Sequence, residues 1–159
     1  MSTALPFWRS LLFVPANVPK FVDKAPSIGA DGIQLDLEDA VAASEKDTAR
    51  RAIPKVARKL KATGTTIVVR INRPWRLAVR DLEEAVIPEV DVLTLPMVDS
   101  ADHIKAIAEV VGELEVERGL EVGRIKFIGL VEEAAAFFRA EAIAGADPRL
   151  VAISLGMED

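Results

Sequence analysis

The chain alternates between short apolar runs and longer stretches in which apolar residues recur every three or four positions. The short runs have the continuous, β-branched character of strands buried in a parallel sheet. They span residues 10–15, 33–37, 67–72, 91–96, 127–131 and 151–156. The stretches between them have the spacing of amphipathic helices, and they span residues 17–28, 44–63, 81–86, 100–114 and 134–144. The pattern therefore predicts five strand–helix units followed by a sixth strand.

Regular alternation of this kind, with short connections, predicts right-handed crossovers and a parallel α/β sheet. We expect one domain over residues 1–159. A closed (βα)8 TIM barrel takes about 250 residues and at least about 200. We therefore expect a (βα)5β6 portion of a TIM barrel in which the last two units are absent, as in a fragment of a longer protein. An open sheet is the alternative.

The composition narrows the classes of function. Half of the residues are hydrophobic, and the formal net charge of −5 comes without any run of five like charges. This balance argues against nucleic acid or an anionic membrane as partner. No apolar stretch reaches the roughly 18–20 residues of a membrane-spanning helix, and no signal peptide is recognisable. The absence of cysteine excludes disulfides, thiolate zinc sites and a cysteine nucleophile, and we expect a cytoplasmic enzyme.

The second strand is acidic on one face. Alternation along residues 33–38 places Ile33, Leu35 and Leu37 on one side and Gln34, Asp36 and Glu38 on the other. Buried polar groups need water or a charged partner. The polar face of this strand, continued by Asp39, therefore indicates a site for a cation.

Two later strands also run into acids, Glu132 after the fifth and Asp159 after the sixth. Parallel α/β sheets bind ligands at the carboxyl ends of their strands, so these two carboxylates are candidate ligands of one ion. Oxygen-only ligands favour Mg²⁺, or Mn²⁺, over zinc, and Glu38 and Asp39 would hold the waters of the ion. The alternative is that the acids only begin helices, where the helix dipole favours them.

Arg70 is the only charged residue within the strand at residues 67–72. A buried arginine must find a partner, because leaving it unpaired is costly. Its two possible roles are to bind a substrate oxygen and to form a structural ion pair with Asp36 or Glu38. By contrast, Arg9 precedes the first strand and is expected to be structural, and His103 is expected to cap a helix or lie on the surface.

Six segments carry a family signature. In chain order they are Arg9-Ser10-Leu11-Leu12-Phe13-Val14-Pro15, Gly29-Ala30-Asp31, Leu35-Asp36-Leu37-Glu38-Asp39-Ala40-Val41, Val69-Arg70-Ile71-Asn72, Leu95-Pro96 and Leu155-Gly156-Met157-Glu158-Asp159. Together they resemble the citrate lyase beta subunit family. This is the group of Mg²⁺-dependent citryl-CoA, malyl-CoA and related lyases within the HpcH/HpaI aldolase superfamily.

The resemblance implies a (βα)8 barrel and a homo-oligomer, often built from trimers, that cleaves a carbon–carbon bond of a hydroxyacyl-CoA to give an acetyl-CoA-type thioester and an α-keto acid. It also implies Glu132 and Asp159 as Mg²⁺ ligands, Glu38 and Asp39 around the waters of the ion, and Arg70 as the catalytic clamp on a substrate oxygen. We expect Phe13, Arg70 and Glu132 to contact the acyl-CoA or α-keto acid. The alternatives are a CoA-thioester hydrolase on the same metal site and a non-enzymatic, inactive paralogue.

Three positions depart from the family pattern. Val18 replaces an arginine that often helps to hold the CoA thioester, Met97 replaces the lysine usual after Leu-Pro, and Glu133 replaces a threonine or serine. The first departure bears on CoA recognition, and the other two predict an altered pocket.

Overall fold

The computed structural model describes residues 8–156, in which six parallel strands form one sheet in the order β1-β2-β3-β4-β5-β6. The strands are β1 (Leu11–Pro15), β2 (Gly32–Asp36), β3 (Thr66–Arg70), β4 (Val92–Leu95), β5 (Lys126–Val131) and β6 (Leu150–Leu155). Because each strand pairs with its neighbours in sequence, every connection is a crossover, and each crossover carries one or two helices. The predicted parallel α/β sheet with (βα)5β order is confirmed.

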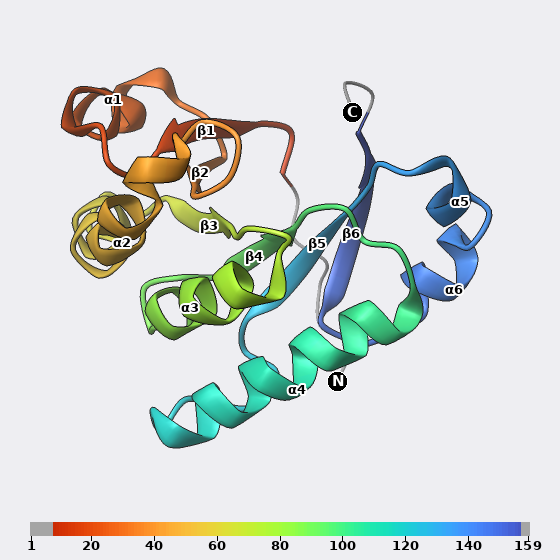
Figure 1. Cartoon of the computed structure of the whole chain (residues 1–159). Helices are drawn as coiled ribbons and strands as arrows, with labels where there is room; N and C mark the ends of the chain where they lie inside the picture. Colours follow the sequence, from red (N-terminus) through yellow and green to blue (C-terminus); the bar gives the residue numbers. More distant parts are fainter. Residues whose placement is uncertain (1–7, 157–159) are drawn as a thin grey trace.

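The helices lie on one side of the curved sheet (Figure 1). They are α1 (Pro19–Lys24), η1 (Ala25–Ile28), η2 (Ala43–Glu45), α2 (Lys46–Lys61), α3 (Trp75–Ala85), α4 (Ala101–Glu117), α5 (Ala134–Phe137) and α6 (Ala140–Ala144). No helix within residues 8–156 is both long and apolar enough to cross a bilayer.

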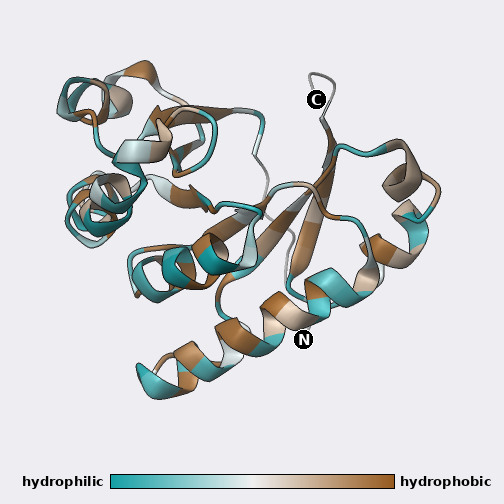
Figure 2. Cartoon of the chain, in the orientation of Figure 1, coloured by the Kyte–Doolittle hydropathy of each residue, from teal (hydrophilic) through white to brown (hydrophobic). Residues whose placement is uncertain are grey.

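The two faces of the sheet are buried differently. Strand residues such as Ile33 and Leu35 join the helices in one large apolar cluster, and the strands and inner helix faces are accordingly apolar in Figure 2. The opposite, concave face holds a smaller cluster of Val68, Val92 and Ile128. It also carries the polar side chains of β2, as the alternation predicted, because residues two apart in a strand share a face.

The sheet is curled as part of a barrel but is not closed. The Thr94 hydroxyl of β4 donates a 2.8 Å hydrogen bond to the Gln34 side chain of β2, across the intervening strand β3. Within residues 8–156, the outer edges of β1 and β6 have no strand partner. The curvature is consistent with a partial barrel.

Several helix boundaries differ from those predicted. Helix α3 begins at Trp75 rather than Asp81, because Pro74 precedes it and proline is well suited to a helix start. One helix was predicted over residues 134–144, but the chain forms two short ones, α5 and α6, on either side of Arg139.

Three side chains lie in unexpected surroundings. Phe137 and Phe138 are large apolar residues, yet they are 55% and 87% exposed, because α5 is a single turn that ends at this pair. His103 was expected to cap a helix or lie on the surface, but its side chain is buried, with its ring edge-on to Trp75.

Candidate active site

The site begins at the end of β2, where Asp36 is fully buried. Its carboxylate accepts hydrogen bonds from the backbone N–H groups of Glu38 (2.8 Å) and Ala40 (3.0 Å), which fixes the turn after the strand. It also accepts two hydrogen bonds from Arg70, at 2.8 and 2.6 Å. Burial alone would raise the pKa of Asp36, but these hydrogen bonds outweigh it and hold the pKa below its usual value.

Arg70 lies opposite Asp36 because the two residues are in register on the paired strands β2 and β3. Its Nη1 atom lies 3.0 Å from carboxylate oxygens of both Glu38 and Asp39, and its guanidinium stacks 5.2 Å from the centre of the Phe13 ring. Three of the five N–H groups of an arginine are then used in hydrogen bonds. The structural ion pair with Asp36 is present, and Arg70 keeps donors for a further oxygen.

Glu132 follows β5 and is held from two sides. Its Oε2 atom accepts a 2.7 Å hydrogen bond from the backbone N–H of Met97. A Cβ atom placed on Gly156 would lie 2.3 Å from the Glu132 Cγ and 2.8 Å from Oε1. The carboxylate therefore rests against the backbone at the end of β6. Any residue other than glycine at position 156 would place its Cβ atom in the space that the Glu132 side chain occupies.

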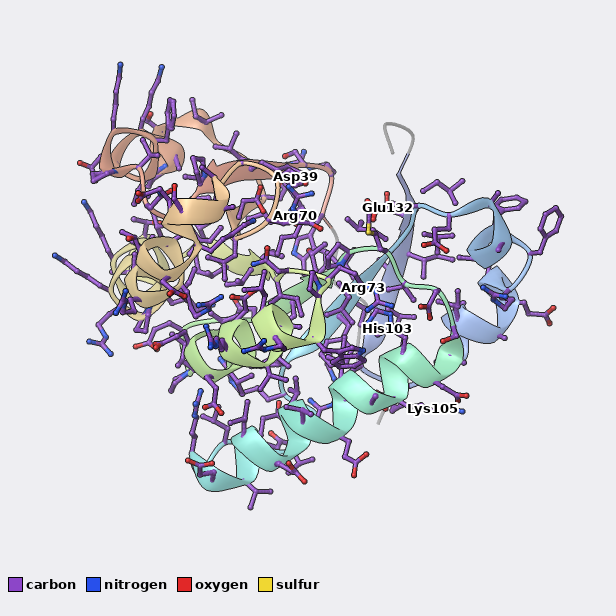
Figure 3. The ribbon with its side chains drawn as sticks, in the orientation of Figure 1. Asp39, Arg70, Arg73, His103, Lys105 and Glu132 are labelled. Atoms are coloured by element: carbon purple, nitrogen blue, oxygen red, sulfur yellow. The ribbon has the colours of Figure 1, made fainter. Side chains whose placement is uncertain are left out.

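These groups surround one cavity of about 580 Å³ on the concave side of the sheet. Residues from both edge strands and from the centre line it, namely Phe13, Asp36, Asp39, Ala40, Arg70, Leu130, Glu132, Ser154, Leu155 and Gly156. Figure 3 shows Asp39, Arg70 and Glu132 near one another at the same end of the sheet. The carboxyl ends of the strands thus form the site, as expected for a parallel α/β sheet.

The electrostatics of the cavity are acidic. Burial raises the pKa of Glu38 to about 7, and the nearby carboxylates of Asp39, Glu132 and Asp36 add to the rise, although Arg70 acts in the opposite direction. Lys46 donates hydrogen bonds to the Leu37 and Glu38 carbonyls, and burial lowers its pKa. Three carboxylates and the partly ionised Glu38 lie around one guanidinium and one ammonium, so negative charge is in excess, which suits a cation.

The structure brings most of the predicted site residues together. Phe13, Asp39, Arg70 and Glu132 line the cavity, and Glu38 reaches it through its contact with Arg70. Asp159 lies outside the described residues, so its predicted part as a ligand stays a prediction. Within residues 8–156, no three acidic or histidine side chains lie close enough to hold a metal ion by themselves.

Three contributors to the site were missed by sequence reasoning. Asp36 was considered as part of the polar face of its strand and as a partner of Arg70, but its hydrogen bonds to the turn that carries Glu38 and Asp39 were not foreseen. Lys46 and Gly156 were not considered as part of the site. A glycine at the end of a predicted strand was the available signal for Gly156, but its close contact with Glu132 depends on how β5 and β6 pair.

The other singled-out residues lie elsewhere. Arg9 pairs with Asp31 at the amino ends of the strands, with a 2.8 Å contact, as its expected structural role requires. Val18 and Glu133 precede α1 and α5 without a side-chain cap. Met97 contributes to the site through its backbone N–H, which donates to Glu132.

The sequence match is to the family described as HpcH/HpaI aldolase/citrate lyase, over residues 9–159. The chain belongs to this family. The citrate lyase subunit beta of Leuconostoc mesenteroides subsp. cremoris is 34% identical over 154 residues, which cover 95% of this chain and 50% of that protein. The L-malyl-CoA/beta-methylmalyl-CoA lyase of Rhodobacter capsulatus is 36% identical over 155 residues, which cover 95% and 48%.

A solved structure of the family agrees with the fold. The citrate lyase beta subunit of M. tuberculosis, complexed with oxaloacetate and magnesium, is 32% identical with a TM-score of 0.70, covering 93% of this chain and 57% of that one. The chain spans about half the length of the curated relatives it matches. The resemblance seen in the sequence is confirmed.

Proposed function

We propose that the protein is a Mg²⁺-dependent carbon–carbon lyase that cleaves a hydroxyacyl-CoA, such as citryl-CoA or malyl-CoA, into an acetyl-CoA-type thioester and an α-keto acid. The observation that carries the proposal is the meeting of Glu132, Asp39 and Arg70 around one cavity. The names of the relatives support it: citrate lyase subunit beta and malyl-CoA lyase.

The residues of the cavity fit a magnesium ion. The donors are oxygens alone, which Mg²⁺ prefers, and carboxylates outnumber cationic groups. Within the described residues, only Oε2 of Glu132 accepts a hydrogen bond, so Oε1 remains to bind an ion. Asp159 is proposed as the second ligand, and Glu38 and Asp39 would bind the waters of the ion. The M. tuberculosis relative is complexed with magnesium. Once bound, Mg²⁺ would supply positive charge for the oxygens of the α-keto acid unit. Mn²⁺ also prefers oxygen ligands and would fit the same site.

The side chains of the cavity have distinct proposed roles in a retro-Claisen cleavage. The substrate hydroxyl loses its proton and becomes the carbonyl of the α-keto acid, while the electron pair of the broken carbon–carbon bond moves to the thioester as an enolate, which then gains a proton. Arg70 would stabilise the developing negative oxygen with its remaining N–H groups, a preorganised arrangement because Asp36 fixes the guanidinium. Phe13 would cover that guanidinium and exclude water.

The test is product analysis with citryl-CoA and malyl-CoA in the presence of Mg²⁺. We expect an α-keto acid and an acetyl-CoA-type thioester in equal amounts, and we expect Glu132→Ala to abolish both Mg²⁺ binding and cleavage. Free CoA with an intact hydroxy acid would instead reveal a thioester hydrolase. No turnover together with undiminished Mg²⁺ binding by Glu132→Ala would reject the site assignment.

We also propose that the working form is a cytoplasmic homo-oligomer built from trimers, as the family resemblance implies. Light scattering coupled to size-exclusion chromatography measures the mass in solution. A monomer at all concentrations would contradict this part of the proposal.

A further inference from the structure

Met97 has an unusual backbone conformation. Its φ angle is 46°, the one positive value among non-glycine residues in the described part of the chain. Residues with a side chain rarely adopt this left-handed conformation. It persists only where the surrounding structure over-determines it, and such positions cluster at functional sites.

Both polar backbone groups of Met97 have a side-chain partner. Its N–H donates to Glu132 Oε2 at 2.7 Å, and its carbonyl accepts a 3.1 Å hydrogen bond from Nε of Arg73. Arg73 comes from the loop between β3 and α3, whereas Met97 precedes α4 and Glu132 follows β5. The three residues therefore link the carboxyl ends of three neighbouring strands.

Arg73 is itself anchored. Its Nη2 atom donates to the Asp99 carboxylate at 2.7 Å, and the Asp99 carbonyl accepts a 2.8 Å hydrogen bond from Arg139. The Ser100 hydroxyl donates to the other Asp99 carboxylate oxygen at 2.7 Å. With the guanidinium fixed at one end, its Nε–H has one direction, which is toward the Met97 carbonyl. Figure 3 shows Arg73 between His103 and Glu132 on this side of the site.

We propose that Arg73 is a positioning residue that holds Met97 in its left-handed conformation, so that the Met97 N–H fixes the Glu132 carboxylate for ion binding. The link to the ion rests on the proposed function. Arg73 does not line the cavity, so its effect passes through the backbone of Met97.

The physical reason lies in the direction of the Met97 N–H. If this residue relaxed to the ordinary right-handed region, its N–H and its carbonyl would turn relative to each other and could not keep both the hydrogen bond to Glu132 and the one from Arg73. The backbone at Gly156 lies against one side of the Glu132 side chain. Without Met97 the carboxylate would be free to turn away from the cavity.

The first measurement is the amide signal of Met97 in protein labelled with ¹⁵N-methionine, which is sparse because the chain has three methionines. A Met97→Leu variant assigns the signal by its loss. We expect a downfield amide proton in the parent, because the N–H donates to a carboxylate, and an upfield shift in both Arg73→Gln and Glu132→Gln. The matched control is Arg76→Gln, which makes the same change at an exposed arginine on the first turn of α3.

The second measurement is Mn²⁺ affinity by electron paramagnetic resonance, with urea unfolding of every variant to monitor the fold. Partners that orient metal ligands typically change affinity about 10- to 100-fold, and we expect Arg73→Gln to weaken binding about tenfold at the lower end of that range. Adding Met97→Gly to Arg73→Gln should recover part of the affinity, because glycine adopts positive φ without strain. A purely structural role for Arg73 would not give this recovery.

The outcomes are separable. An Arg73→Gln protein that matches Arg76→Gln in both the amide signal and Mn²⁺ affinity would overturn the inference, and so would a double variant that regains no affinity. A parent protein that binds no Mn²⁺ would reject the proposed function, while the amide shift would still decide whether Arg73 positions Glu132 through Met97.

Discussion

Gly156 shapes the site through the side chain that it lacks. Its φ angle is not in the left-handed region, so an alanine there is disfavoured only by space: the new Cβ would lie 2.3 Å from Glu132 Cγ. The carboxylate must then move from its place beside the cavity. We expect Gly156→Ala to weaken Mn²⁺ binding at least about tenfold, as changes around metal ligands do.

A second glycine supplies the control for this substitution. In Gly145→Ala the new Cβ would meet its nearest atom, the Glu141 carbonyl oxygen, at 3.7 Å, which is ordinary contact. Calorimetric Mn²⁺ titration of both variants should find a change only in Gly156→Ala. Equal affinities would show that Glu132 does not need its present position.

Glu38 makes stability depend on pH. Its pKa rises to about 7 in the folded protein from an ordinary value of 4.5, mainly through burial. A carboxyl with a raised pKa contributes stability that is complete below the unfolded value and is lost as pH rises through the folded value. In EDTA, Glu38→Gln should therefore gain stability relative to the parent between pH 5 and pH 8. We expect about 1–2 kcal/mol after allowance for solvent screening.

Urea unfolding of both proteins at the two pH values measures this difference. Glutamine resembles the protonated carboxyl, so the two proteins should differ least at pH 5. A difference that does not grow with pH would mean that Glu38 ionises normally in the fold.

At the scale of elements, a buried ion pair ties helix α4 to the start of β6. Glu115 near the end of α4 accepts two hydrogen bonds from Arg149, at 2.9 and 2.7 Å, and both residues are buried. Glu115 also accepts the backbone N–H groups of Gly123 (2.8 Å) and Ile125 (2.9 Å). One carboxylate thus links the end of α4, the loop after it and the residues just before β5 and β6. This ion pair lies at the amino ends of the strands, whereas the site lies at their carboxyl ends.

Removing this carboxylate leaves the buried Arg149 guanidinium without a charged partner, and the backbone N–H groups of Gly123 and Ile125 without their acceptor. Loss of one member of a buried pair costs about 3–5 kcal/mol, and we expect Glu115→Ala to lower the free energy of unfolding in urea by that amount. Glu113→Ala, at an exposed position of the same helix, should change it by less than about 0.5 kcal/mol. Similar values for the two variants would show that the pair contributes little.

At the scale of the whole molecule, the sheet is covered unevenly. β3 is buried over most of its length, whereas β6 is mostly exposed, with Ile153 and Leu155 39% and 56% exposed. Within residues 8–156, β6 hydrogen bonds to β5 alone. Local stability should therefore fall from the middle of the sheet toward its edge.

Hydrogen exchange measures this gradient directly. Amides in exposed, sparsely packed elements open at lower free energy than those in the core. We expect the β6 amides to exchange at least about tenfold faster than those of β3. Equal protection would mean that β6 is covered in solution, for example by a second copy of the chain.

The sequence by itself determined the order of elements and the class of fold. The β-branched runs and the helical spacing between them specify local structure directly, because each depends on the residues within one element. Alternation in β2 likewise placed Ile33 and Leu35 toward the helices and Asp36 on the other face. Helix limits were predicted less well, as the early start of α3 and the break at Arg139 show, because these depend on single turns.

The tertiary structure decided the contacts that make the site. Asp36 and Arg70 meet because β2 and β3 pair in one register. Glu132 has its position because Met97 and Gly156 approach from neighbouring strands. Distances of this kind depend on how separate elements pair and curl, and no local pattern of residues encodes them. The sequence could name the acids and the arginine, but only the fold determined which of them share a cavity and which backbone atoms hold them there.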